Sequence, residues 1–239
     1  MIWLFDLDNT LHNASLAIFP EISANMNAFL SVYMKKNGDV RLSTEAANQL
    51  RIEYWKRFGA TLLGISKVLD QRARDFLEAA HRFYDLKSLL SAERGLPVLF
   101  RKLPGRKVLL TNSAYRYSAD ILKLLGVHQF FEKHIAIESM RVFGKFEPKP
   151  SGKFFRKLLA MLKVRPEDCV LVEDNIHILK KAKAMGMKTV LVTRYLDRGR
   201  FSQHSYPYPS GKRQAGRPAF IDLKMTSVRR LTHYLERFC

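Results

Sequence analysis

The chain has 239 residues, of which 47% are hydrophobic and 26% are charged. This length and composition allow a real core, so they exclude disorder throughout and favour one core with a substantial insertion. Lys and Arg together number 41 against 22 Asp and Glu, which gives a formal net charge of +19. Such a charge attracts nucleic acid, acidic lipid or phosphorylated metabolites without selecting among them.

The sequence also bears on the compartment. No apolar run approaches the roughly 20 residues that a helix needs to span a bilayer, and the first residues do not resemble a secretory leader. Cys169 and Cys239 are too few for a disulfide framework or a structural zinc site, and free thiols suit a reducing compartment. We therefore expect a cytoplasmic protein that has no membrane segment.

Short apolar runs that end in polar residues recur along the chain and predict buried parallel strands. They lie at 2–5, 107–110, 169–172 and 188–192, with a weaker candidate at 134–137 and an edge strand at 219–223. Helical patterns follow Ser113, Ser151 and Asn175, and a last helix is expected through Leu231 and Leu235. The alternation predicts an α/β fold: a doubly wound, Rossmann-like parallel sheet with helices on both faces.

The stretch after the first strand differs in kind. From about residue 15 to residue 93 the sequence has helical periodicity and no convincing strand. We therefore expect a catalytic core of residues 1–14 and 94–239 and an inserted, all-helical cap of residues 15–93. A mobile lid over the strand ends is the favoured interpretation, and a static helical layer is the alternative.

Asp6 and Asp8 are the first candidates for catalysis. Phosphate monoesters hydrolyse so slowly unaided that an enzyme must supply a positioned nucleophile, charge stabilisation and a proton for the leaving oxygen. Two carboxylates just beyond a strand end can face one crevice, with Asp6 as nucleophile and Asp8 as acid and base. For that duty we expect the pKa of Asp8 to rise from about 3.9 toward neutrality.

A cation is also required, because two carboxylates would repel a phosphate dianion. Mg²⁺ suits hard oxygen ligands, and a carboxylate oxygen of Asp6, the main-chain carbonyl of Asp8 and a carboxylate of Asp174 could hold it. Glu173 is a candidate outer partner of the metal. Lys149, which lies between two prolines, can place a second positive charge against Asp6.

Thr111 and Asn112 complete the candidate site. The Thr111 side chain and the main-chain amide of Asn112 stand at a helix start, where they are suited to bind phosphate together with Lys149. All the candidates follow predicted parallel strands or lie in the adjoining loop, where open sheets bind ligands.

Four ordered segments resemble the motifs of the haloacid dehalogenase superfamily, and the resemblance spans nearly the whole predicted core. The segments are WLFDLDNTL from Trp3, LTN ending at Asn112, KP at Lys149 and VEDN from Val172. The resemblance implies an aspartyl-phosphate on Asp6, Mg²⁺ as cofactor and a helical cap. Asp8 favours a phosphatase, since the dehalogenating members lack an acid there.

A finer resemblance is to the pyrimidine 5′-nucleotidase branch. It rests on DNTL from Asp8, FPEI from Phe19, the cap segment YWKRFGATLLG from Tyr54, and EDN from Glu173. This resemblance implies a nucleoside monophosphate as substrate, with Arg57 and Thr61 as cap residues that face it. The alternative for the cap segment is an ordinary helix and turn. His12 departs from the branch, which often has Tyr there, and we interpret it as a polar gate or a satisfied neighbour rather than a catalyst.

Three functions remain open at this point. The favoured one is Mg²⁺-dependent hydrolysis of a small phosphomonoester, and the second is transfer or hydrolysis of another small phosphate, such as phosphoglycolate or a sugar phosphate. The third is a nucleic-acid-binding protein on the same fold, since residues 194–217 combine Arg, Lys and Tyr in a loop suited to single strands. We do not favour the third, and the sequence does not indicate an oligomeric state.

Overall fold

The computed structural model describes the chain except for residues 34, 37–39, 59–60, 69–71, 197–217 and 239. The basic loop at 194–217 therefore lies outside the described residues apart from its first three. The described residues form two compact units, and each is considered by itself. One consists of Met1–Ala14, Leu90–Leu196 and the C-terminal segment, and the other of Ser15–Leu89.

The first unit contains a parallel sheet of six strands in the order β10-β9-β8-β1-β4-β5. Every neighbouring pair in this sheet is parallel, which confirms the predicted doubly wound α/β fold. The strands are β1 (Ile2–Phe5), β4 (Arg106–Leu110), β5 (Lys133–Ile135), β8 (Cys169–Glu173), β9 (Lys188–Val192) and β10 (Leu223–Met225).

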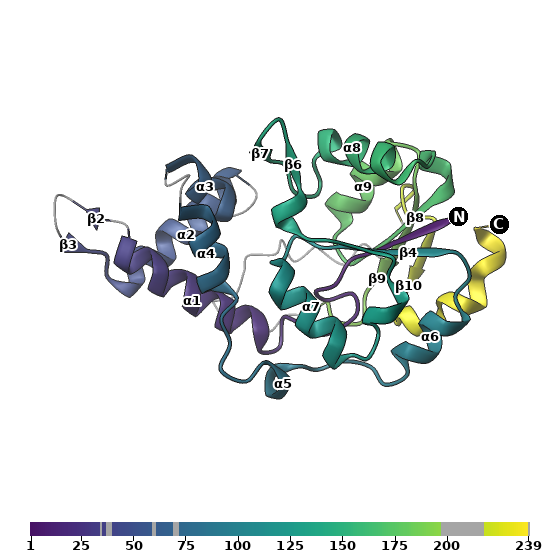
Figure 1. The fold of residues 1–239 in the computed structure, drawn as a ribbon, viewed down its shortest axis with the longest axis horizontal. Coiled ribbons are helices and arrows are strands. Elements are labelled where there is room, and N and C mark those ends of the chain that lie inside the picture. The colour runs from purple at the N-terminus through teal and green to yellow at the C-terminus, as the bar shows by residue number, and fades with distance from the viewer. Residues whose placement is uncertain (34, 37–39, 59–60, 69–71, 197–217, 239) are drawn as a thin grey trace. The chain divides into compact units, whose positions relative to one another are not determined.

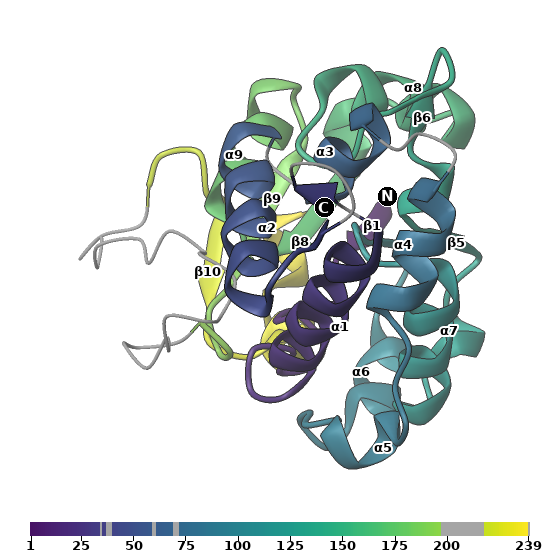
Figure 2. The same cartoon turned by 90° about the vertical axis from the view of Figure 1, so that its left-hand side faces the viewer.

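Helices cover both faces of this sheet. Alternate residues of each strand point to opposite sides and therefore pack against different helical layers. Ile2 and Leu4 face a cluster with α8 (Gly152–Leu162) and α9 (Ile176–Ala184). On the other face, which holds α6 (Leu96–Lys102) and α7 (Tyr115–Leu124), Phe5 packs 5.0 Å from Phe100 between ring centroids. Figures 1 and 2 show these two helical layers on opposite sides of the strands.

Several local predictions need correction. The N-cap of α7 is Ala114 rather than Ser113, and the Ala114 side chain makes no capping hydrogen bond; the Ser113 hydroxyl donates to Asp8. The edge strand is Leu223–Met225 instead of 219–223, and Val228–Arg237 forms 3₁₀ turns rather than an α-helix. An antiparallel hairpin of β6 (Arg141–Val142) and β7 (Lys145–Phe146) was not predicted.

The second unit is helical, apart from a two-residue antiparallel ladder that the sequence did not predict. Its helix α1 is contacted by α2 and α4, and it lies between them in Figure 2. The helices are α1 (Ile18–Tyr33), α2 (Thr44–Phe58), α3 (Thr61–Val68), α4 (Ala73–Ala80) and α5 (Leu86–Leu89), and the ladder joins β2 (Lys35–Lys36) to β3 (Val40–Arg41).

A close approach between α2 and α3 explains part of the YWKRFGATLLG segment. The ring of Tyr54 lies directly against the Cα of Gly64, so that a Cβ added at Gly64 would stand 2.4 Å from Cγ of Tyr54. Gly64 therefore allows two helices of this unit to pack together. This contact lies inside the second unit.

Replacing Gly64 with Ala is expected to destabilise this unit by about 1–3 kcal/mol through overpacking. The higher helix propensity of Ala, about 1 kcal/mol, offsets part of that loss. Urea unfolding measures the effect. In a Tyr54→Ala background the same change should be neutral or stabilising, because the ring is gone; equal destabilisation in both backgrounds would contradict the packing argument.

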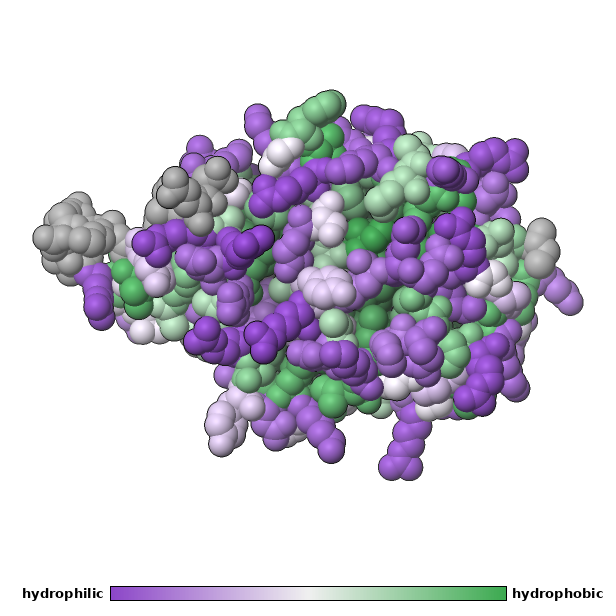
Figure 3. Space-filling view, viewed as in Figure 1, coloured by the Kyte–Doolittle hydropathy of each residue, from purple (hydrophilic) through white to green (hydrophobic). Residues whose placement is uncertain are grey.

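The surface of the described residues is rich in polar groups. Figure 3 shows hydrophilic side chains over most of the visible face, with smaller hydrophobic areas between them. Among the described residues, no helix is both long enough and apolar enough to cross a membrane.

Candidate active site

The sheet register brings the predicted catalytic residues to one edge. Phe5, the last residue of β1, pairs with Leu109 of β4 and with Val172 of β8. The chain then leaves all three strands at their carboxyl ends, at Asp6, Thr111 and Asp174. All three residues are buried. The site thus lies where parallel α/β sheets bind ligands.

Lys149 bridges two carboxylates at this edge. Its Nζ lies 2.8 Å from Oδ1 of Asp6 and 2.8 Å from Oε2 of Glu173, and its side chain is 1% exposed. Asn112 holds the loop that carries Lys149, since its side-chain amide donates to the Lys149 carbonyl and accepts from the Lys149 amide. The lysine is therefore fixed by its backbone as well as by its charge.

The turn after β1 orients the two aspartates. Asn9 has a left-handed φ of 59°, a conformation that Asn tolerates better than most residues, and Leu11 donates its amide to the Leu7 carbonyl. This tight turn lets the Thr10 hydroxyl donate to Oδ2 of Asp6 at 3.0 Å. Each oxygen of Asp6 thus has one donor, Lys149 or Thr10.

Asp8 is contacted by three donors. Ser113 Oγ lies 2.5 Å from its Oδ2, Tyr117 Oη lies 2.6 Å from its Oδ1, and His12 Nε2 lies 3.0 Å from its Oδ1. His12 is fully buried. The roles of Ser113 and Tyr117 were not predicted, because no local sequence pattern connects the loop after β4 or α7 with Asp8.

The geometry fits a divalent cation. Oxygen atoms of Asp6, Glu173 and Asp174 lie within 4.8 Å of one another. Oδ2 of Asp174 is buried and has no hydrogen-bond partner among the described residues, as expected of a carboxylate oxygen that binds a metal ion. Both carboxylate oxygens of Glu173 already accept hydrogen bonds: Oε1 accepts the amides of Asp174 and Asn175, and Oε2 accepts from Lys149. An outer role for Glu173 stays a prediction.

Burial and like charge raise the pKa values of two acids in this cluster. The pKa of Asp6 rises from 3.8 to about 7, mainly through burial and then through the charge of Glu173, against the opposing effect of Lys149. The pKa of Asp174 is raised well above its ordinary value by burial and by Glu173. A nearby cation would stabilise both ionised carboxylates.

The pKa of Asp8 differs from the value that the sequence led us to expect. Burial alone would raise its pKa, but hydrogen bonds from His12, Ser113 and Tyr117 outweigh burial and lower it. The expected rise toward neutrality is therefore wrong for the site without substrate. A phosphate dianion beside Asp8 would act in the opposite direction, because a like charge favours the protonated acid.

Stability without divalent cations is expected to fall as pH rises from about 4 to about 7. The folded pKa of Asp6 lies above the unfolded one, so the folded state retains a proton that the unfolded chain has lost. Unfolding free energy therefore decreases with pH in that window. MgCl₂ should then raise the melting temperature by several degrees near pH 8 and by less near pH 5, because metal binding competes with protons.

Two variants control that measurement in EDTA and MgCl₂. Asp174→Asn should lose most of the Mg²⁺-dependent shift, because it removes the carboxylate oxygen for which the described residues offer no hydrogen-bond partner. Asp168→Asn, which changes a half-exposed carboxylate, should keep the full shift. A shift of equal size at both pH values, or one that survives Asp174→Asn, would contradict a cation held by this cluster.

The side chains of Thr111 and Asn112, which were predicted to lie at the phosphate site, both form hydrogen bonds within the protein. The Thr111 side chain is buried, and its Oγ1 accepts the amide of Ser113 at 3.0 Å. The Asn112 side chain is occupied by the Lys149 backbone, so its support of Lys149 is a function that the sequence did not indicate. Phosphate binding by the Thr111 hydroxyl and the Asn112 amide stays a prediction.

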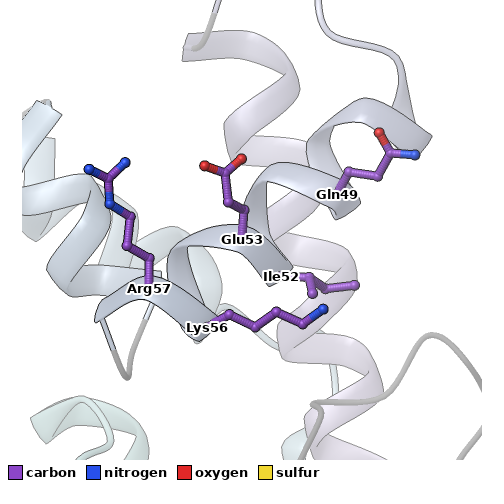
Figure 4. A pocket seen from close by; sticks show the side chains of 5 residues that line it. All are labelled: Gln49, Ile52, Glu53, Lys56 and Arg57. Carbon is purple, nitrogen blue, oxygen red and sulfur yellow. The ribbon is translucent and has the colours of Figure 1, made fainter.

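The cap candidates differ from each other. Thr61 is buried and its hydroxyl donates to the Arg51 carbonyl at 3.3 Å, which supports a structural role within the cap. Arg57 lies on the outer face of α2, where it lines a groove with Gln49, Ile52, Glu53 and Lys56 (Figure 4). Among these two, Arg57 is thus the better candidate for contact with a ligand.

Comparison with known proteins gives a consistent picture. Residues 2–186 match the family model of haloacid dehalogenase-like hydrolases. Pyrophosphatase PpaX of Halalkalibacterium halodurans is 26% identical over 195 residues, which cover 79% of this chain and 81% of that protein.

Solved structures share the fold over nearly the whole chain. An HAD phosphatase from Thermococcus onnurineus has a TM-score of 0.57 at 18% identity, and covers 98% of this chain and 97% of its own. The magnesium-bound putative hydrolase YfnB from Bacillus subtilis also has a TM-score of 0.57, at 15% identity, with 98% of each chain covered. At these identities the similarity shows the fold alone.

Proposed function

The chain belongs to the haloacid dehalogenase-like hydrolases, and on that premise we propose that it hydrolyses a small phosphomonoester through a phosphorylated Asp6. One observation carries the proposal: Asp6 is buried at the sheet edge, with Lys149 2.8 Å from one oxygen and Thr10 3.0 Å from the other. A carboxylate held by two donors has little conformational freedom. It is therefore prepared for attack on a phosphorus atom.

Each remaining residue has a role in this proposal. An oxygen of Asp6 forms a bond to phosphorus while the bond to the ester oxygen breaks, and Asp8 gives that oxygen its proton. Asp8 then takes a proton from the water that cleaves the aspartyl-phosphate. Lys149, Thr111 and the Asn112 amide stabilise the negative charge of the phosphoryl oxygens.

Mg²⁺ is the proposed cofactor. Carboxylate oxygens of Asp6 and Asp174 and the main-chain carbonyl of Asp8 would hold it. Glu173 would not bind the ion directly but would position Asp174 by accepting its main-chain amide. When bound, the ion supplies positive charge that offsets repulsion between the carboxylates and the phosphate. Support comes from the acidic cluster and from the oxygen of Asp174 that has no hydrogen-bond partner in the described part of the chain.

Nucleoside 5′-monophosphates, pyrimidine ones first, are the proposed substrates. The support is the resemblance of the DNTL, FPEI, YWKRFGATLLG and EDN segments to the pyrimidine 5′-nucleotidase branch. Part of the cap segment has a packing explanation in the contact of Tyr54 with Gly64, so its weight as a specificity signal is reduced. The similarity to a pyrophosphatase adds inorganic pyrophosphate as a second candidate substrate.

A panel of phosphate compounds tests this assignment. Phosphate release is measured with MgCl₂ for UMP, CMP, AMP, pyrophosphate, phosphoglycolate and a hexose phosphate, with and without an acceptor alcohol. Pyrimidine nucleotides should have the highest kcat/KM. A higher value for pyrophosphate, phosphoglycolate or the hexose phosphate would overturn the nucleotide assignment, and acceptor-dependent loss of phosphate release would indicate transfer as in a mutase.

Nucleic-acid binding remains the rival function, and its main support is the net charge of +19. Its predicted binding loop lies largely outside the described residues. Affinity for single-stranded DNA or RNA that falls steeply with salt and is unchanged by Asp6→Asn would favour it.

A further inference from the structure

The carboxylate of Asp8 is surrounded by donors whose function the proposed reaction does not yet explain. They are Ser113, Tyr117 and His12, which come from the loop after β4, from α7 and from the turn after β1. We propose that these three residues form a positioning clamp, called here the Asp8 clamp, that fixes the acid for proton delivery to the leaving oxygen. This inference rests on the proposed function and deepens it.

The distribution of donors determines which oxygen is available. A carboxylate offers about four lone-pair sites. Tyr117 and His12 both point at Oδ1, at 2.6 and 3.0 Å, whereas Ser113 is the one donor to Oδ2 among the described residues, at 2.5 Å. Oδ1 is therefore occupied on both sides, and Oδ2 is the oxygen that retains room for a transferable proton.

Burial makes the clamp hard to replace by solvent. The relative exposure is 0% for His12 and 2% for Tyr117, so water cannot readily substitute for either donor. His12 is held by backbone bridges to Asp8 and to Ala92, and its ring lies edge-on to Tyr117 at 6.4 Å between centroids. Since His12 donates to Asp8 through Nε2, that nitrogen must carry hydrogen. The orientation of Asp8 is thus set by groups that are themselves fixed.

The position of Asp8 matters in the first chemical step, in which the leaving oxygen receives a proton. A bond forms between Asp6 and phosphorus, the bond from phosphorus to the ester oxygen breaks, and the proton on Oδ2 of Asp8 passes to that oxygen. The alcohol leaves and Asp8 becomes a carboxylate. A leaving group of low pKa, such as p-nitrophenolate, departs without a proton, whereas an alkoxide does not. A loosened clamp should therefore slow alkyl esters selectively.

Tyr117→Phe tests the clamp, because it removes one donor and keeps the buried ring. We measure kcat/KM, which covers the steps up to departure of the alcohol, for p-nitrophenyl phosphate and for glycerol 2-phosphate. The value for glycerol 2-phosphate should fall by about 10- to 100-fold, and that for p-nitrophenyl phosphate by less than about 3-fold. Tyr115→Phe, which removes a hydroxyl from an exposed tyrosine of the same helix, should change neither value.

Ser113→Ala provides a second, independent variant, since Ser113 is only half-buried and its loss leaves α7 packed. It should show the same selectivity as Tyr117→Phe. In an Asp8→Asn background, where the acid is absent, neither substitution should lower kcat/KM for glycerol 2-phosphate further. This non-additivity separates positioning of Asp8 from general damage to the fold.

The outcomes are distinguishable. An equal loss for both esters, no loss for either, or a full additional loss in the Asp8→Asn background would overturn the clamp while leaving the proposed function intact. If wild type and Asp6→Asn hydrolyse both esters equally, the proposed function itself fails and the clamp fails with it.

Discussion

Asp6→Asn is expected to lower kcat/KM for every hydrolysed phosphate compound by about 10⁴-fold or more, as removal of a catalytic nucleophile does in other enzymes. The amide of Asn is a poor nucleophile, and it cannot form the mixed anhydride that a carboxylate forms. The change is nearly isosteric, and Lys149 keeps its contact with Glu173 at 2.8 Å. The variant should therefore stay folded, which circular dichroism and thermal unfolding check.

Asp120→Asn is the matched control, because it makes the same change at a half-exposed residue of α7 whose partner is the exposed Lys123. It should retain wild-type activity. Mass spectrometry of rapidly quenched enzyme should detect one added phosphoryl group in wild type and none in Asp6→Asn. Activity of Asp6→Asn at the wild-type level, or a phosphoryl group found on another residue, would exclude Asp6 as the nucleophile.

The strand ends could be predicted from sequence because each combines a continuous apolar run with an abrupt polar stop. Asp6, Thr111 and Asp174 all follow such runs, and parallel pairing places the ends of β1, β4 and β8 at one edge. No knowledge of side-chain contacts is needed for that conclusion. Lys149 could also be named from the sequence as a positive charge for Asp6, and its 2.8 Å contact with Asp6 joins residues 143 positions apart.

The partners of Asp8 could not be predicted, since they depend on tertiary contacts. Tyr117 is 109 residues and Ser113 is 105 residues from Asp8 along the chain. Ser113 has a plausible local role as a helix cap, but the N-cap residue is Ala114, whose side chain makes no capping hydrogen bond. A cap uses the hydroxyl oxygen as an acceptor, whereas the contact with Asp8 uses its hydrogen, so a local cap pattern carries no information about the tertiary contact.

In the predicted cap, the sequence does not distinguish residues that pack helices together from residues that select a substrate. The segment from Tyr54 to Gly64 looked like a specificity signature, yet the structure explains Tyr54, Gly64 and Thr61 by packing within one unit. Arg57 is left as an exposed cation beside Glu53 and Lys56 on α2. A motif shared with a family can thus reflect helix packing as well as substrate choice, and the sequence does not separate the two.

Lys149→Met should cause the second large effect, a fall in kcat/KM of about 10²- to 10³-fold, because it removes a fixed positive charge from the site of phosphoryl transfer. Methionine keeps most of the side-chain volume but cannot donate to Asp6 or Glu173. The same change should reduce stability by about 3–5 kcal/mol near pH 8, because two buried carboxylates lose their shared cation. Lys153→Met, at an exposed ion pair with Glu147, should affect neither quantity appreciably.

The pH dependence of that stability loss separates its electrostatic part from lost packing. Lys149 opposes the rise in the pKa of Asp6, so its removal should raise this pKa above about 7. An acid whose folded pKa exceeds its unfolded pKa loses stability as pH increases between the two values. The difference between Lys149→Met and wild type, measured by urea unfolding in EDTA, should therefore shrink as pH is lowered from about 8 to about 5. A deficit of the same size at both pH values would mean that Lys149 acts by filling space, and the buried cation between Asp6 and Glu173 would then have no measurable role in holding the site together.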